Sequence, residues 1–173
     1  MVQAAERTAG LAILLRSAMG SLPSAVAILT ARDPVSDEPV GMVVSSVISA
    51  SLDPPSMAVA VNQSAAIHRC LAARGRFCIS FLNVEQRDLV PVFSSWSRRG
   101  ERFTGPGWQE LHGLDYLEGA IAVFCNVSGS IVCGTHEIFV GEVNDVQPTA
   151  AFSPLAWMSG GCHGLSPLAV AES

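Results

Sequence analysis

The chain has 173 residues, of which 49% are hydrophobic and only 14% are charged, with a formal net charge of −5. This length predicts a single domain over residues 1–173, with a core at about 11–168 that buries about 70% of the surface exposed by the unfolded chain. The acidic balance argues against nucleic acid as a partner, because phosphate neutralisation needs a basic face. So few charges indicate that apolar surface is hidden in a subunit contact or a ligand pocket.

The N-terminus and the cysteines indicate a cytoplasmic protein with reduced thiols. The apolar stretch at 11–15 follows Glu6 and Arg7 and is broken by Arg16, unlike a signal peptide. No segment approaches the roughly 18 apolar residues of a membrane span. The five cysteines are odd in number and contain no C-x-x-C pair.

The first part of the chain predicts one helix and then three strands. Apolar side chains recur at helical spacing over residues 9–19, and Gly20 suits the end of that helix. Short apolar runs that are partly β-branched predict the strands, which span residues 24–31, 39–52 and 57–62. Asp53-Pro54-Pro55 separates the last two, because proline donates no hydrogen bond to a strand ladder.

The rest of the chain predicts short helices among further strands. Ser64 is placed to cap a helix over 65–73, and Asn83 to cap another that runs towards Phe93. Residues 94–109 have little periodicity, and this loop is long enough to act as a lid. The predicted strands span residues 77–82, 120–127, 131–133 and 137–146, with a Ser-Gly-Ser break at 128–130.

Strands therefore dominate, and the helices are few and short. This pattern is typical of a mainly β fold, an antiparallel β-barrel with helices at its ends. A doubly wound sheet is disfavoured, because G-x-G-x-x-G is absent.

No motif indicates catalysis by side chains alone. The sequence has no G-x-S-x-G, its four histidines form no H-E-x-x-H pattern, and its cysteines and histidines lack the spacing of a closed zinc site, so we expect no metal. An enzyme of this kind takes its chemistry from a cofactor. The apolar run at 41–55 contains four serines, which suit the polar edge of a flat heterocycle lying on an apolar floor.

Several short motifs, in the right order, resemble the flavin reductase-like family. They are Met19-Gly20, 25–30, 39–42, Ser45-Ser46, 51–55, 62–67, Arg76-Phe77, Arg102-Phe103, 117–120, 134–138 and 141–143, and the resemblance covers about residues 13–165. It implies a split β-barrel of Greek-key, FMN-binding type that forms a homodimer. It also implies an NAD(P)H-dependent flavin reductase, which reduces FMN or FAD with NADH or NADPH and releases reduced flavin to a partner flavin-dependent monooxygenase.

The resemblance also implies a set of site residues. Residues 42–46 would line the isoalloxazine ring, and residues 62–67 would hold the flavin phosphate. A helix start supports the second role independently, because its free N–H groups and partial positive charge bind phosphate with few basic residues. The cofactor-binding candidates are Met42, Val43, Val44, Ser45, Ser46, Val61, Asn62, Ser64, Ala65, Ile67, Arg102, Phe103 and Trp157, and His136 is the candidate for nicotinamide contact.

Three positions depart from the family pattern. Val43 stands where the family usually has Thr, Thr135 where it has Asp before the His, and Cys162 where an aromatic residue is common. None of these removes hydride transfer, which needs stacked rings rather than a catalytic side chain.

Simpler interpretations remain open for the main candidates. Ser45 and Ser46 also suit close strand packing, His136 a hydrogen-bonded strand end, Arg102 a solvated loop and Trp157 the core or a dimer interface. At the level of function, the alternatives are a non-catalytic flavin-binding carrier or sensor and a structural dimer. An oxidase acting on a pyridoxine-type phosphate is a further alternative, but it would carry more Arg and Lys.

Overall fold

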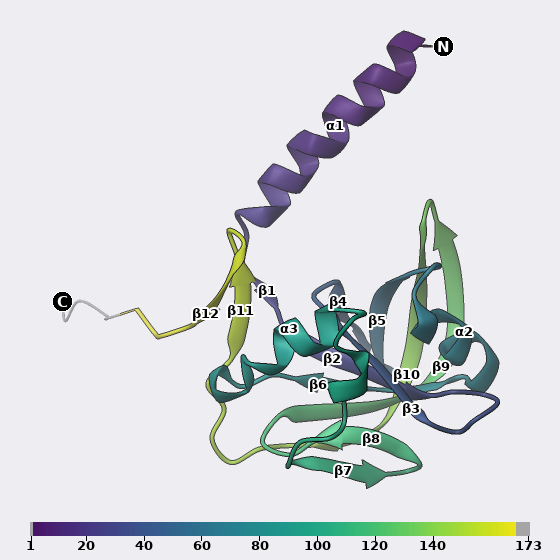
Figure 1. The fold of residues 1–173 in the computed structure, drawn as a ribbon, viewed down its shortest axis with the longest axis vertical. Coiled ribbons are helices and arrows are strands. Elements are labelled where there is room, and N and C mark those ends of the chain that lie inside the picture. The colour runs from purple at the N-terminus through teal and green to yellow at the C-terminus, as the bar shows by residue number, and fades with distance from the viewer. Residues whose placement is uncertain (1, 169–173) are drawn as a thin grey trace.

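A seven-stranded antiparallel sheet forms the body of the protein in the computed structural model, which describes residues 2–168, with side chains from residue 7 (Figure 1). The strand order is β3-β2-β6-β9-β10-β5-β4. Their bounds are β2 Ala27–Arg32, β3 Pro39–Val44, β4 Val47–Leu52, β5 Pro55–Asn62, β6 Arg76–Phe81, β9 Ile121–Cys133 and β10 His136–Gln147. The expectation of a mainly β fold is confirmed.

The two edge strands of this sheet are consecutive in the chain. Only Ser45 and Ser46 separate β3 from β4, and two residues span at most about 7 Å. The sheet must therefore curl until its edges meet, which closes it into a barrel. The prediction of one strand over 39–52 was wrong, because the chain turns a corner at these serines and the Ala60 amide donates to the Ser46 carbonyl at 3.0 Å.

Two smaller sheets complete the β structure. They contain β1 Ser24–Ala25, β11 Leu155–Met158 and β12 Gly161–Gly164 in one, and β7 Trp108–Leu111 and β8 Leu114–Leu117 in the other. The strand predicted over 24–31 breaks at Val26, whose amide donates to the Leu155 carbonyl and whose carbonyl accepts from the Leu82 amide. Sequence analysis missed β7, β8, β11 and β12, because each is only four residues long, and all but β11 mix polar with apolar side chains or glycine.

The longest hairpin, β9–β10, runs beyond the barrel at its far end (Figure 1). The predicted break at 128–130 was wrong, because β9 continues through it. Val140 pairs with Gly129 and Gly141 with Val127, so Ser128 is the extra residue of a β-bulge. Its hydroxyl donates to the Val140 carbonyl at 3.2 Å.

The helices differ in how they meet the barrel. They are α1 Val2–Gly20, α2 Ala66–Arg74 and α3 Leu89–Ser94, with 3₁₀ turns η1 Val84–Gln86 and η2 Arg99–Glu101. α1 ends at Gly20 as predicted but begins earlier, and it projects away from the barrel (Figure 1). The helix predicted from Asn83 to Phe93 is divided into η1 and α3, although the Asn83 capping box is present. Within residues 2–168, no helix is long and apolar enough to cross a membrane.

α2 is held where the barrel closes. Its buried side chains are Ile67, Cys70 and Leu71, and Gly75 ends it in the left-handed conformation at φ 65°. The predicted cap was wrong. The N-cap is Ala65, because Asn62 instead accepts the Ser64 amide at 2.9 Å and the Ser64 hydroxyl at 2.7 Å.

Candidate functional site

A groove runs across the corner between β3 and β4. It consists of three adjoining hollows of about 350, 140 and 780 Å³, which share lining residues: Val43 and Ser94 between the first two, Ser45 and Trp157 between the last two. Of the predicted site residues, those that line it are Met42, Val43, Ser45, Ser46, Ala65, Ile67, Arg102 and Trp157. Eight of the predicted positions, from four separate segments, therefore lie along one groove.

The middle of the groove is formed by an edge strand and the serine corner. β3 pairs only with β2 in the ladder, so alternate backbone groups along its other edge point outward. Ser45 and Ser46 are exposed, and neither hydroxyl has a hydrogen-bond partner among residues 7–168. Met42, Val43 and the exposed ring of Trp157 supply apolar wall. This combination suits a flat ring that is apolar on its faces and polar at its edge.

One end of the groove is the N-terminus of α2. Ala65, Ala66 and Ile67 line it, and the amides of Ala66 and Ile67 have no hydrogen-bond partner in the described part of the chain. Free amides at a helix start bind anions, because they donate hydrogen bonds along the direction of the helix dipole. The segment is fixed from behind, since the Gln63 amide and side chain donate to the Thr135 and Gly134 carbonyls, each at 3.0 Å.

Arg102 lines the same end, but its guanidinium is engaged in holding the protein together. It donates to the carbonyls of Gly41 at 2.8 Å, Val92 at 3.2 Å, Phe93 at 3.1 Å and Ser95 at 2.9 Å. Burial lowers the pKa of Arg102 from its ordinary value, with a smaller contribution from the nearby Arg99 charge. Arg102 is therefore not the solvated loop charge of the simpler interpretation; it fixes the loop to β3.

Phe103 does not line the groove. It is half-buried and packs against Phe93 and Trp108, with ring centroids 5.3 and 4.7 Å away. The Phe103 and Phe93 rings explain why residue 41 is a glycine, because a Cβ there would lie 3.0 Å from both Phe103 Cζ and Phe93 Cε1. The structure places Phe103 against the core that supports the groove, and its contact with the cofactor stays a prediction.

Four other predicted residues lie outside the groove lining. Val44 and Val61 are buried in the barrel core, because side chains alternate between the two faces of a strand. The Asn62 side chain accepts both hydrogen bonds from Ser64, so these two side chains bind each other beside the groove. The first two predictions are therefore wrong for side-chain contact.

His136 is exposed at the first position of β10, where it is the register partner of Asn62. Its Nδ1 lies 3.0 Å from Thr135 Oγ1. It does not line any of the three hollows, and its contact with nicotinamide stays a prediction. Within the described range, no group of three or more metal-ligating side chains comes together.

Among the groove residues that the sequence analysis did not name are Ser94, at the end of α3, and Trp96 just after it. Trp96 is 64% exposed, and the Arg99 guanidinium lies 4.7 Å from its ring. A tryptophan in the loop proposed as a lid was the available signal, because large aromatic side chains contribute strongly to the energetics of binding surfaces.

The comparisons with known proteins agree with this geometry. The chain is 34% identical over 153 residues to the FMN reductase (NADH) RutF of Stutzerimonas stutzeri, covering 87% of each chain. It is 30% identical over 154 residues to the reductase component of the FADH(2)-dependent resorcinol hydroxylase of a Rhizobium species, covering 88% of this chain and 86% of that one.

A solved structure is also similar. The NADH:FAD oxidoreductase SgcE6 of Streptomyces globisporus, in complex with NAD and FAD fragments, superposes with a TM-score of 0.83 at 27% identity. The match covers 91% of this chain and 94% of that one. Residues 19–166 match the flavin reductase like domain, and the chain belongs to that family.

Proposed function

We propose that this protein is an NAD(P)H:flavin oxidoreductase that reduces FMN or FAD and supplies free reduced flavin to a partner monooxygenase. One observation carries the proposal. The groove brings together polar groups that have no hydrogen-bond partner within residues 7–168, the Ser45 and Ser46 hydroxyls and the Ala66 and Ile67 amides, along an apolar wall. Membership of the flavin reductase like domain family supports it.

The residues present fit a flavin nucleotide. Met42, Val43 and Trp157 offer apolar surface for the ring, and the two serines offer hydrogen bonds to its polar edge. The α2 amides offer donors for a phosphate without a dedicated basic residue. When bound, FMN or FAD would supply the chemistry by accepting a hydride from NADH or NADPH.

The contribution of the chain itself is positioning. The groove turns the encounter of two dissolved molecules into a fixed pair. Holding well-oriented reactants together can lower the activation barrier by up to about 7–11 kcal/mol. Trp96 and Trp157 line two adjoining hollows that share Ser94, so rings bound there would be covered in part by these side chains. Arg102 is the arginine that lines the α2 end of the groove, and it donates to four carbonyls, so its guanidinium is not available to bind the phosphate tightly. Weak binding suits a flavin that must leave.

A homodimer completes the proposal. Large apolar side chains are exposed on α1, on β4 and at the β9–β10 end, and they include Leu14, Leu15, Ile48, Ile131 and Val132. Ile48 lines the largest hollow together with residues from the C-terminal end of α1, so a second copy bound there would border the groove.

We further propose that the protein is one domain and lies in the cytoplasm, where NAD(P)H is available and the five free cysteines stay reduced.

The test is an absorbance assay of NADH or NADPH oxidation with FMN, FAD or riboflavin at catalytic protein concentration. We expect many turnovers per protein with at least one pair. Tight stoichiometric flavin without nicotinamide oxidation would identify the carrier or sensor instead, and no binding of any flavin would exclude both.

The dimer has its own test, sedimentation of the wild type against Ile48→Lys, with the exposed turn residue Val35→Lys as the matched control. We expect the mass of two chains for wild type and control, and a shift towards one chain for Ile48→Lys. A wild type with the mass of one chain would contradict the dimer and leave the reductase proposal to its own assay.

A further inference from the structure

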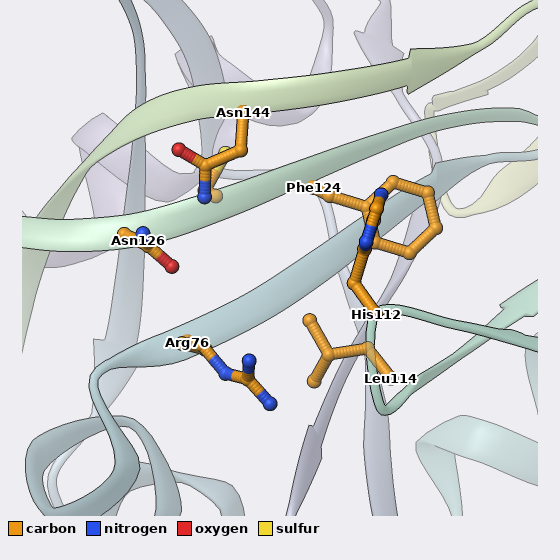
Figure 2. A pocket seen from close by; sticks show the side chains of 7 residues that line it. Arg76, His112, Leu114, Phe124, Asn126 and Asn144 are labelled. Carbon is orange, nitrogen blue, oxygen red and sulfur yellow. The ribbon is translucent and has the colours of Figure 1, made fainter.

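A second cavity, of about 220 Å³, lies away from the groove, between the sheet and the turn of the β7–β8 hairpin (Figure 2). It shares no lining residue with the groove. Figure 2 shows the side chains of Arg76, Asn126 and Asn144 on the neighbouring strands β6, β9 and β10, with the Arg76 guanidinium extending toward the hairpin that carries His112 and Leu114.

The polar wall comes from three neighbouring strands. Arg76 and Asn126 are register partners on β6 and β9, which places their side chains on the same face. On β10, Val143 pairs with Cys125 and Asp145 with Phe124, so Asn144 is the extra residue of a bulge. Bulges redirect side chains and recur next to functional sites.

Arg76 is an arginine without a counterion. Nearby Arg32 pairs with Glu110 at 2.6 Å and Asp115 at 2.9 Å, and Arg74 pairs with Asp37 at 2.7 Å. Arg76 forms no ion pair or side-chain hydrogen bond with any residue of the described chain. The side-chain amides of Asn126 and Asn144 likewise have no partner among residues 7–168. Arg76, Asn126 and Asn144 are all exposed at the opening of the cavity, and Arg76 also borders a neighbouring hollow that Asp37 lines.

The nearby carboxylates of Asp145 and Glu142 do not pair with Arg76 or with the two asparagine side chains. Asp145 binds His112, with its Oδ2 2.9 Å from Nε2, and this hydrogen bond is the largest cause that lowers the pKa of Asp145. Glu142 is the register partner of Asn126 on β10, but it neither lines the cavity nor pairs with Arg76. The guanidinium therefore remains the unmatched charge at this opening.

The opposite wall is apolar. Leu114 and Phe124 are 3% and 1% exposed, and the His112 ring meets Phe124 edge-on at 5.6 Å. The volume is below the range of about 300–1,000 Å³ typical of drug-sized ligands, so a nucleotide is too large. A small molecule with an apolar body and one carboxylate matches both walls.

We propose that this cavity binds a small organic carboxylate, with the acid group on Arg76, Asn126 and Asn144 and the apolar body against the exposed His112 ring, which lies beside the buried Phe124. The inference does not depend on the reductase proposal, since its readout is binding. Arg76 supplies charge-assisted bidentate hydrogen bonds to the carboxylate, and the amides fix its orientation.

The experiment titrates the full-length protein with benzoate. Binding is measured by calorimetry and by the shifts of backbone amide resonances. Acetate lacks the apolar body and benzamide lacks the charge, so we expect both to bind more weakly. Arg76→Gln should weaken benzoate binding by about tenfold or more, the usual effect of losing a hydrogen bond to a charged group. Arg87→Gln, at an exposed arginine elsewhere, is the matched control and should bind as the wild type does.

Because benzoate is flat, the groove is the competing location, and FMN distinguishes the two. We expect saturating FMN to leave benzoate affinity unchanged, and Asn144→Ala to weaken it in a protein that unfolds at the wild-type temperature. Displacement by FMN, equal binding to wild type and Arg76→Gln, or the absence of saturable binding would each overturn the proposal.

Discussion

The groove and the second cavity use the same residue type, arginine, in opposite ways. In the groove, Arg102 donates to four backbone carbonyls and the ligand is offered hydroxyls and free amides instead. In the cavity, Arg76 has no partner in the described chain, and the ligand is offered the guanidinium itself. The difference teaches that an arginine in a pocket is a binding group only where no carbonyl or carboxylate of the protein already occupies it.

The largest expected effect separates the two arginines by stability. Arg102→Met removes donors from four carbonyls, and we expect it to lower the free energy of unfolding by about 3 kcal/mol, because buried acceptors lose their partners. Arg76→Met breaks no ion pair or side-chain hydrogen bond within residues 7–168 and should stay within about 0.5 kcal/mol of the wild type. Urea unfolding measures both. Equal losses in the two variants would abolish the distinction.

A second prediction concerns the packing behind the groove. Gly41→Ala places a Cβ 3.0 Å from two phenyl rings and 3.2 Å from the Leu29 carbonyl oxygen. We expect a loss of about 1–3 kcal/mol in unfolding free energy, the usual cost of overpacking. Gly129→Ala, with nothing within 4 Å of the added carbon, is the control and should lose less. Thermal unfolding distinguishes them, and equal midpoints would contradict the close approach.

A third prediction sharpens the role of the serine corner. Ser45→Ala with Ser46→Ala should weaken FMN binding by about 1–2 kcal/mol, because each hydroxyl contributes a typical hydrogen bond. Stability should be unchanged, since neither hydroxyl has a partner in the described chain. Fluorescence titration with FMN measures the affinity. Ser49→Ala, on β4 outside the groove lining, should bind FMN as the wild type does; unchanged affinity in the double variant would remove the corner from the site.

The smallest expected effect is a pH dependence of the free energy of unfolding, caused by Asp33, which pairs with Arg69 of α2. The amides of Val35 and then Ser36, followed by the Arg69 charge, lower the pKa of Asp33 from its ordinary 3.8. A lowered folded-state pKa stabilises the protein above 3.8, and this stability is lost as pH falls through the lower folded value.

The wild type should therefore exceed Asp33→Asn in stability above pH 3.8, with the difference vanishing on further acidification. The control is Asp88→Asn, whose carboxylate is 92% exposed. Urea unfolding across the acid range follows all three proteins. A difference that persists at the lowest pH would assign the effect to packing rather than charge.

Features that depend on neighbours in the chain could be predicted from the sequence alone. The ends of α1 and α2 at Gly20 and Gly75 and the capping box at Asn83 follow from local backbone preferences. The ordered motifs, from Met19-Gly20 to residues 141–143, also determined the family, which the match over 19–166 confirmed. Eight of the predicted site residues line the groove, and six of them lie at the end of β3, at the serine corner or at the start of α2, which are local features.

Contacts between distant segments were decided only by the tertiary structure. The predicted strand over 39–52 is divided at Ser45-Ser46, where the chain turns as the barrel closes. The Ser64 hydroxyl, expected to cap α2, donates to the Asn62 side chain instead. Arg102 donates hydrogen bonds to four carbonyls, whereas Arg76 has no ion pair or side-chain hydrogen bond within residues 7–168. Each is followed by a phenylalanine, so the local sequence does not distinguish them. The physical reason is that a side chain's partners lie on other strands, and hydrogen bonds and packing across the barrel outweigh local preference.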